Sequence, residues 1–463
     1  MNHKEIIANW KEFKIPALFS RNHNINLESD FIITISGPRR AGKTFICFQI
    51  IEELIRNGIS RDNILYINFE DNKLIGADSN DLEKLLESYF ELYNVNKDKK
   101  IYLFFDEIQA VKNWDSWVRK IYDINKKIKL ILTGSSSKLL SKEISTILRG
   151  RVLNKEIFPL SFKEIVSWKG LKYNLKTIAY SEDKIEIKKL FNNFIQDGGY
   201  PAVTYQKVNR EEVLQSYYES MIFKDIVERY KIEDVKKIKM LANLLLESTS
   251  KDISYSKLAN KLKSIGMNTS KNTVIEFLSY FEDAYLFFQN IKYEYSQGKQ
   301  LGSIKKVYFI DNGMLNSVSF KFSKDIGKLL ENLIFLELRR RNKKIFYNRD
   351  NYECDFIIQE KEKVVQAIQV TENLNSENEK REIEGLLEAM NKFKLKEGFI
   401  ITLNEERDIE DLEKPLKSSK NRFENPRITR KLEGYSKLSI ERKGKKIHVL
   451  PVWKWLLEKD EGI

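Results

Sequence analysis

The sequence predicts an α/β fold in which a parallel sheet near the amino terminus is followed by a helical region and by a second, smaller α/β domain. Two observations carry this prediction. From residue 31 to about residue 160, short apolar segments alternate with amphipathic helical segments, as in a parallel sheet covered on both faces. A glycine-rich motif follows the first of these segments, where phosphate-binding loops occur. With 463 residues, the chain is long enough for about three domains.

The first 160 residues supply the elements of the predicted parallel sheet. Residues 1–30 have mixed charge and a helical pattern, and we expect them to form a helical lead-in to a domain at 31–160. The expected strands are short, apolar and rich in β-branched or aromatic residues; they are 31–36, 63–69, 101–105, 129–133 and about 152–158. The alternation then stops, and a helical pattern covers 161–232 with a break at 198–201.

The glycine-rich motif Gly-x-x-x-x-Gly-Lys-Thr lies between an apolar strand and an amphipathic helix, the context that a P-loop requires. Its glycines allow the loop amides to turn toward phosphate groups, and the helix start favours anions. We expect Lys43 to reach the β- and γ-phosphates of ATP, and the Thr44 hydroxyl to bind Mg²⁺. The predicted nucleotide-binding residues are Gly37, Pro38, Arg39, Arg40, Ala41, Gly42, Lys43 and Thr44.

Two acids end the third predicted strand and complete the expected site. Asp106 is predicted to hold Mg²⁺, and Glu107 to orient or deprotonate the attacking water. The fourth strand ends in Thr-Gly-Ser-Ser-Ser, and from this polar segment we expect Ser135 to lie beside the γ-phosphate. Arg149 and Arg151 are candidates for an arginine finger that reaches the nucleotide of a neighbouring subunit. The alternative for each arginine is an ion pair with a local carboxylate.

Residues 233–320 show a helix-turn-helix pattern followed by two strand-like segments, which predicts a winged helix-like region. Ser254 and Ser270 stand where they can cap the two helices. The strand-like segments are 286–293 and 306–310. Lys271 begins the second helix, where contacts to nucleic acid usually arise. Winged helices also serve as ATPase lids or as protein docks, and this alternative stays open.

From residue 327 to the end, the pattern predicts a small α/β domain with strands at 344–347, 354–358, 364–370 and 398–402. Residues 414–446 carry 12 Lys or Arg and 3 Glu, and their Asn, Ser, Gly and Pro content predicts a loop-like basic insertion. This insertion is a candidate phosphate-binding arm. The alternative is a solvated insertion without a partner.

The charge and the cysteine content indicate which partners and which kinds of site to expect. The chain has 80 Lys+Arg against 67 Asp+Glu, a net charge of +13, which favours a polyanionic partner. Charged surfaces of proteins from hot environments are the alternative explanation. Two isolated cysteines and three scattered histidines predict neither a disulfide framework nor a zinc site, and fit a reducing cytoplasm. No apolar stretch is long enough to span a bilayer, so we expect no membrane partner and no secretory signal.

Together these segments resemble a family of AAA-type ATP-binding proteins that is abundant in archaea and found in many bacteria. The likeness rests on SGPRRAGKT, ILYINFEDNKL, IYLFFDEIQ, LILTGSSS, PLSFKEI, GGYPAV, Lys224-Asp225, KKVYFIDNG, LLENLIFLELRRR, ECDFII and LPVWKWL. The resemblance implies an AAA-like P-loop sheet with an extra glutamate, a helical lid at 161–232, a winged helix at 233–320, and a restriction-nuclease-like domain at 327–463. It implies no substrate.

A nuclease of the implied kind needs metal-binding carboxylates and a nearby lysine. The matching positions here are Glu331, Asp355, Gln369 and Thr371. Gln369 adds no negative charge, and Thr371 stands where the lysine is needed. We therefore expect a degenerate nuclease-like domain, used for binding or assembly, with no cation beside Asp355.

The functional prediction is an ATP-hydrolysing molecular switch that uses ATP and Mg²⁺ and acts on nucleic acid, with a homo-oligomer implied if an arginine acts in trans. Two alternatives stay open. The first is a signalling or assembly protein that binds ATP tightly, hydrolyses it slowly and recruits a protein partner. The second is an ATP-regulated nuclease.

Overall fold

The computed structural model describes residues 2–136, 150–175, 177–178, 181–319, 325–404, 438–442 and 444–458. The chain divides into two compact units. The first comprises Met1–Pro159, Glu219–Ile232 and Ser279–Leu286, and the second comprises Leu160–Tyr218, Glu233–Leu278 and Phe287–Ile463.

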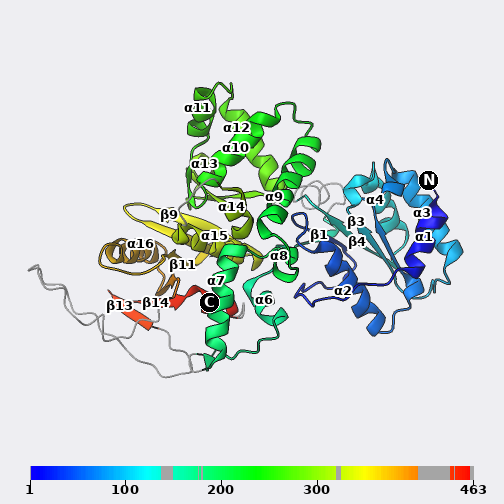
Figure 1. Ribbon diagram of the computed structural model, residues 1–463, viewed down its shortest axis with the longest axis horizontal. Helices are drawn as coiled ribbons and strands as arrows, with labels where there is room; N and C mark the ends of the chain where they lie inside the picture. The colour runs from blue at the N-terminus through cyan, green and yellow to red at the C-terminus, as the bar shows by residue number, and fades with distance from the viewer. Residues whose placement is uncertain are drawn as a thin grey trace, which may run out of the picture. The chain divides into compact units, whose positions relative to one another are not determined.

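The first unit is built on a five-stranded, fully parallel sheet with the order β2-β3-β4-β1-β5 (Figure 1). Its strands are β1 Ile32–Ser36, β2 Ile64–Asn68, β3 Ile101–Asp106, β4 Ile128–Gly134 and β5 Val152–Glu156. All residues of β1, β3 and β4 are buried, which explains their nearly continuous apolar sequences. The predicted α/β fold with a parallel sheet is therefore confirmed, and each strand ends within two residues of its predicted limits.

Helices α1 His3–Glu12, α2 Lys43–Arg56, α3 Ser79–Leu92 and α4 Trp114–Ile124 complete this unit, with short 3₁₀ turns η1 Arg61–Asn63, η2 Asn72–Leu74 and η3 Ile108–Ala110. The predicted helical lead-in is helical only over α1. This helix belongs to the core, because Ile7 and Trp10 are buried and the Trp10 indole donates a 2.7 Å hydrogen bond to the Ile64 carbonyl. The connection from residue 13 to residue 30 is not helical.

The region after the sheet is helical, as its sequence pattern indicates. It contains α6 Phe162–Trp168, α7 Asp183–Asp197, α8 Pro201–Tyr205, α9 Arg210–Ser220 and the π-helical segment η6 Met221–Glu228. The predicted break falls between α7 and α8. Gly198 has a left-handed φ of +73°, and the Gly199 amide donates a 2.7 Å hydrogen bond to buried Asp311. A side chain at either glycine would collide with neighbouring atoms.

The second unit also holds α10 Val235–Glu247, α11 Tyr255–Ser264, α12 (Lys271–Asp283) as far as residue 278, and a three-stranded antiparallel sheet. The sheet has the order β6-β8-β7, from β6 Lys251–Ile253, β7 Phe287–Ile291 and β8 Lys305–Phe309. Ser270 caps the second helix by accepting a 3.0 Å bond from the Thr273 amide. Ser254 is the N-cap residue of α11, as predicted, but its side chain makes no capping hydrogen bond. The winged-helix assignment stays a prediction.

The remainder of the second unit is a mixed six-stranded sheet with the order β13-β14-β12-β11-β10-β9. Its strands are β9 Lys344–Arg349, β10 Glu353–Glu360, β11 Lys363–Val370, β12 Glu397–Thr402, β13 Leu438–Arg442 and β14 Lys445–Pro451. The accompanying helices are α13 Gln297–Gly302, α14 Asn312–Val318, α15 Ile326–Arg340, α16 Glu379–Lys392 and α17 Val452–Leu457. Nine of the fifteen residues of α15 are buried.

The predicted basic insertion at 414–446 is not loop-like at its carboxyl end. Residues 438–442 and 445–446 belong to the antiparallel pair β13–β14, and β14 also pairs with β12. The prediction gave more weight to the charges than to the apolar residues Ile447, Val449 and Leu450, which are buried in the sheet. Residues 414–437, like Arg149, lie outside the described residues.

Candidate nucleotide-binding site

The loop at residues 37–42 joins β1 to α2, as the motif predicts, and its backbone requires glycine. A Cβ atom at Gly37 would lie 2.0 Å from the Ile157 carbonyl oxygen. Gly42 caps α2 with φ +103°, and Arg40 also adopts a left-handed conformation, with φ +64°. This path turns the loop around the start of α2, where free amides and the helix dipole favour phosphate.

Lys43 lies inside this loop and points at the predicted catalytic base. Its ammonium is 3.2 Å from the carbonyl oxygens of Gly37 and Pro38 and 3.2 Å from Glu107 Oε1. Burial raises the pKa of Glu107, but the Lys43 charge, the Gln109 hydrogen bond and the Arg39 charge together outweigh burial and lower that pKa overall. Glu107 is therefore a carboxylate at neutral pH, the form that a general base needs.

The two residues predicted to hold Mg²⁺ are in direct contact. The Thr44 hydroxyl donates a 2.7 Å hydrogen bond to Asp106 Oδ2, which also accepts a 2.8 Å bond from the Tyr66 hydroxyl. Thr133 Oγ1 donates to Asp106 Oδ1 and accepts from the Glu107 amide at 3.0 Å. Burial and the adjacent Glu107 raise the pKa of Asp106. Tyr66 and Thr133 thus fix the carboxylate, and neither had a predicted role at Asp106.

A hydroxyl beside a carboxylate suits Mg²⁺, which prefers oxygen ligands and is usually bound through one or two carboxylates together with substrate phosphates. Within the described ranges, no group of three or more His, Cys, Asp or Glu side chains is arranged to hold a metal ion. A magnesium ion bound with ATP at Thr44 and Asp106 needs no such group.

Asp225 is a site residue whose role the sequence did not indicate. It lies on η6, is fully buried, and accepts hydrogen bonds from Arg39 Nε at 2.8 Å, Ser135 Oγ at 2.9 Å and Arg229 Nη2 at 3.0 Å. Burial raises the pKa of Asp225, whereas Arg39 and Arg229 act in the opposite direction. Arg39 also donates a 2.7 Å bond to Glu70. The predicted residues Arg39 and Ser135 are therefore brought together through Asp225, which sequence analysis noted only within a motif.

Arg21 is a second residue that sequence analysis missed. Its guanidinium donates to the carbonyls of Ala41, at 2.7 Å, and Phe158, at 3.0 Å. The side chain thereby ties the P-loop to the chain that follows β5. No periodicity or motif marks Arg21, because its role depends on backbone carbonyls that the fold brings to it.

The structure does not bring Arg151 to the site. Its guanidinium forms an ion pair with Asp123, which matches the alternative of a local carboxylate partner. Because β5 runs parallel to β1 and Val152 pairs with Ile32, Arg151 lies at the end of β1 opposite the P-loop. A five-residue strand separates the two by ~17 Å. Arg149 lies outside the described residues.

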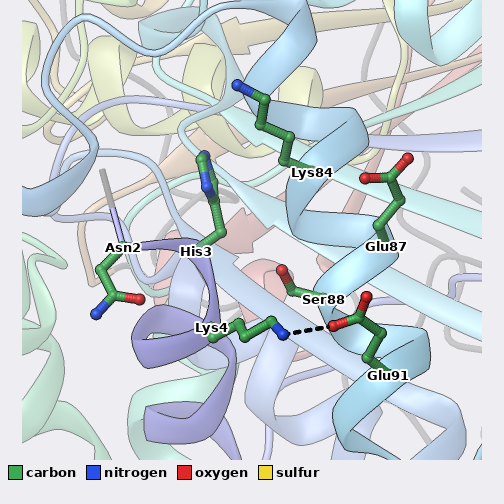
Figure 2. A pocket seen from close by; sticks show the side chains of 7 residues that line it. All are labelled: Asn2, His3, Lys4, Lys84, Glu87, Ser88 and Glu91. Atoms are coloured by element: carbon green, nitrogen blue, oxygen red, sulfur yellow. Dashed lines mark ion pairs between the residues drawn. The ribbon is translucent and has the colours of Figure 1, made fainter.

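A surface depression of about 610 Å³ lies on α1 and α3 (Figure 2). It is lined by Asn2, His3, Lys4, Lys84, Glu87, Ser88 and Glu91. The Lys4 ammonium is 2.8 Å from Glu91, and both side chains are more than half exposed. No residue of the P-loop or of the acidic pair lines this depression.

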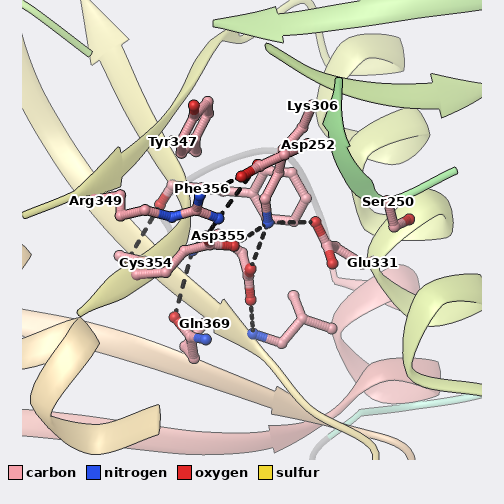
Figure 3. A network of polar contacts seen from close by, with 12 residues as sticks. Ser250, Asp252, Lys306, Glu331, Tyr347, Arg349, Cys354, Asp355, Phe356 and Gln369 are labelled. Atoms are coloured by element: carbon pink, nitrogen blue, oxygen red, sulfur yellow. Dashed lines mark hydrogen bonds and ion pairs between the residues drawn. The ribbon is translucent and has the colours of Figure 1, made fainter. Parts of the chain in front are cut away.

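In the second unit, two of the residues predicted for a degenerate nuclease site do converge. Glu331 and Asp355 lie 2.9 Å and 3.0 Å from the same ammonium, that of Lys306 (Figure 3). The expectation that no cation lies beside Asp355 is therefore wrong. Lys306 belongs to the separate sheet that contains β8, so no local spacing could show it. Gln369 accepts a 3.3 Å bond from the Asp355 amide and donates a 2.6 Å bond to Glu382. The Thr371 hydroxyl donates to the carbonyl of Asn373 at 3.1 Å.

Comparisons with known proteins extend over nearly the whole chain. Residues 29–166 match an AAA domain, and residues 188–325 match a domain of unknown function, DUF8612. Uncharacterized protein MJ1544 of Methanocaldococcus jannaschii is 38% identical over 461 residues, which cover 98% of this chain and 94% of that protein. An uncharacterized protein of Haemophilus influenzae is 30% identical over 75% of this chain and 84% of its own length.

Among solved structures, the Walker-type ATPase PABY2304 of Pyrococcus abyssi aligns with a TM-score of 0.42 at 13% identity. The alignment covers 62% of this chain and 90% of that one. Among the residues that the structure describes, no helix is both long and apolar enough to cross a membrane.

Proposed function

We propose that this chain, which belongs to the same family as uncharacterized protein MJ1544 of Methanocaldococcus jannaschii and contains an AAA domain, is an ATP-hydrolysing molecular switch. ATP binding follows from the P-loop at residues 37–44. Hydrolysis is the further step, and one observation carries it. Two consecutive residues of the P-loop contact the two consecutive acids at the end of β3. The Lys43 ammonium lies 3.2 Å from Glu107, and the Thr44 hydroxyl lies 2.7 Å from Asp106.

This pairing gives each residue a distinct role. The amides of the P-loop and the Lys43 ammonium bind the phosphates of ATP. Thr44 and Asp106 would hold Mg²⁺, which would supply positive charge to the phosphates. Lys43 turns from Glu107 to the phosphates, and Glu107 then takes the proton of the attacking water. Tyr66 and Thr133 keep Asp106 in place during this exchange.

The cluster around Asp225 is the sensing part of the proposed switch. Arg39 belongs to the P-loop, yet its guanidinium is bound to Asp225 and Glu70. The three negative oxygens of a γ-phosphate compete with these carboxylates for Arg39. Asp225 lies within the segment Glu219–Ile232, at both ends of which the chain passes into the second unit. Exchange of Arg39 between Asp225 and phosphate therefore links nucleotide state to this connecting segment.

The first experiment compares wild-type chain and Lys43→Ala by isothermal titration calorimetry with ATP and Mg²⁺. We expect binding of ATP by the wild type and a loss of at least about tenfold in affinity for Lys43→Ala, because a charge-assisted bond to phosphate is removed. Glu87→Gln, an exposed residue of α3, is the control. Equal ATP affinities of wild type and Lys43→Ala would contradict a P-loop mode of binding.

Nucleic acid is the partner that we propose for the switch. Four lysines of the two-helix region are exposed: Lys257, Lys261 and Lys263 on α11 and Lys271 at the start of α12. Their position at one helix-turn-helix and the net charge of +13 both favour contacts to phosphate. A protein partner recruited by an ATP-bound state is the competing proposal, and the dependence of binding on salt separates the two.

A further inference from the structure

The ammonium of Lys306 lies among carboxylates in the interior of the second unit (Figure 3). Its Nζ atom is 2.9 Å from Glu331 Oε1 and 3.0 Å from Asp355 Oδ1, and it also forms an ion pair with Glu353. The Lys306 side chain is 3% exposed. Three carboxylates from α15 and β10 thus surround one buried cation that β8 supplies.

The carboxylates are held in position by other groups of the same unit. The Tyr308 hydroxyl donates a 2.7 Å bond to Glu331, and the Val370 amide donates a 3.0 Å bond to Asp355 Oδ2. Glu353 is also paired with Arg349. The oxygens that face Lys306 are therefore preorganised for a positive charge, and not placed by the lysine alone.

The three carboxylates lie close enough to balance the charge of the buried Lys306 ammonium. A buried carboxylate pair without a counter-ion is strongly unfavourable, because its desolvation is not compensated. The cluster therefore requires a cation at this place.

We propose that the Lys306 ammonium occupies a site with the ligand chemistry of a hard divalent cation, Mg²⁺ or Mn²⁺, and closes the site to metal. The Glu331 and Asp355 oxygens lie about 3 Å from the Lys306 nitrogen. To bind Mg²⁺ at the position of that nitrogen, they would need to move inward by less than about 1 Å, to a distance of about 2.0–2.1 Å. The second unit then keeps this centre assembled without metal. It also lacks a metal-dependent phosphodiester cleavage activity there, which disfavours the ATP-regulated nuclease.

Replacement of Lys306 tests this proposal in the full chain without nucleotide. Lys306→Met and Lys306→Ala remove the ammonium and leave Glu331 and Asp355 without a counter-ion, so their melting temperatures in EDTA fall below that of the wild type. MnCl₂ raises both melting temperatures again. At a concentration a hundredfold above Kd, bound metal multiplies the ratio of folded to unfolded chain about a hundredfold. Wild type and the neighbouring-residue control Lys305→Met show no such response.

Direct Mn²⁺ binding, measured by electron paramagnetic resonance, supplies the second readout. We expect a bound ion in the Lys306 variants and none in the wild type or in Lys306→Met combined with Asp355→Asn. Mn²⁺ bound by nucleotide-free wild type and lost in Asp355→Asn would overturn the proposal. Lys306 variants that Mn²⁺ does not stabilise, including variants that remain insoluble with the metal, would overturn it as well. None of these outcomes depends on ATP hydrolysis.

Discussion

Arg39 Nε, in the phosphate-binding loop, donates a 2.8 Å hydrogen bond to Asp225 Oδ2, 186 positions later in the chain. Asp225 is fully buried and also binds Ser135 and Arg229. The loop proposed to bind phosphate is thus joined by a charged contact to the segment that links the two units in sequence. The proposed sensing of nucleotide rests on this contact.

Asp225→Asn tests whether this carboxylate competes with the γ-phosphate for Arg39. Loss of its charge leaves Arg39 available to ATP, so we expect the affinity for ATP to rise by roughly tenfold, about the contribution of one charge-assisted hydrogen bond. ADP lacks the γ-phosphate, and its affinity should change much less. Fluorescence titrations with ATP and with ADP measure the ratio of the two affinities. Glu87→Gln, an exposed residue of α3 that does not contact Arg39, is the control, and it should change neither affinity.

An Asp225→Asn variant with an unchanged ratio of ATP to ADP affinity would contradict the sensing role. A drop in both affinities would instead indicate that Asp225 only supports the loop. Because removal of one partner from a buried ion pair costs ~3–5 kcal/mol of stability, the titrations belong well below the melting temperature of the variant.

The pH dependence of stability tests the Lys43–Glu107 contact. In the folded chain the pKa of Glu107 lies below its ordinary 4.5, since Lys43, Gln109 and Arg39 together outweigh burial. A lowered acid pKa contributes stability above the unfolded value, and this contribution is lost as pH falls through the folded value. Glu107→Gln should therefore melt at a lower temperature than wild type at pH 7, and the gap should close as pH falls below 4.5. A gap that widens on acidification would show that Glu107 is not ion-paired.

Arg151→Ala tests the placement of the proposed arginine finger. Arg151 is paired with Asp123 at the edge of the sheet opposite the P-loop, so we expect the ATPase rate to stay within about twofold of wild type. The stability loss should be about 0–1 kcal/mol, as for other partly exposed ion pairs. Arg119→Ala, which removes another partner of Asp123, is the matched control. A tenfold lower rate for Arg151→Ala alone, with unchanged ATP binding, would restore Arg151 as a finger.

The nucleic-acid proposal is tested by replacing Lys257, Lys261 and Lys271 together with alanine. If these lysines bind duplex phosphates, affinity falls for all sequences alike, and the slope of log K against log salt flattens by about 0.9 per lost contact. Lys445→Ala, in the predicted basic insertion 414–446, is the control. The Lys445 ammonium already donates to the carbonyls of Met390 at 3.1 Å and Leu395 at 2.6 Å. An unaltered salt slope in the triple variant would favour the protein-partner alternative.

The sequence was sufficient where function depends on neighbours along the chain. The glycines of the P-loop, Lys43 and Thr44 are defined by spacing, and the Asp106–Glu107 pair by the apolar strand before it. Those predictions place the residues where the structure brings them together. The strands of the parallel sheet were predicted for the same reason, since full burial imposes continuous apolar segments.

Contacts between segments that are distant in the sequence could not be predicted. Asp225 reaches Arg39 from a π-helical segment, and Lys306 reaches Asp355 from a different sheet. The spacing of residues along the chain does not reveal the partner of Asp225 or of Lys306. Whether such a charge is buried depends on tertiary packing. The cation beside Asp355 was not predicted because Lys306 lies on β8, in a different sheet, whereas the expected lysine position is at the end of β11, the strand next to β10.

Hydrolysis of ATP by Glu107→Gln, beside the wild type, tests the central claim most directly. Single-turnover assays with Mg²⁺ and saturating enzyme separate binding from chemistry. We predict that Glu107→Gln binds ATP within about threefold of wild type but hydrolyses it ~10²–10⁴-fold more slowly, because the base is lost while Lys43, Thr44 and Asp106 remain. Hydrolysis by Glu107→Gln at the wild-type rate would contradict the assignment of Glu107 as the base and, with it, the proposed hydrolytic switch.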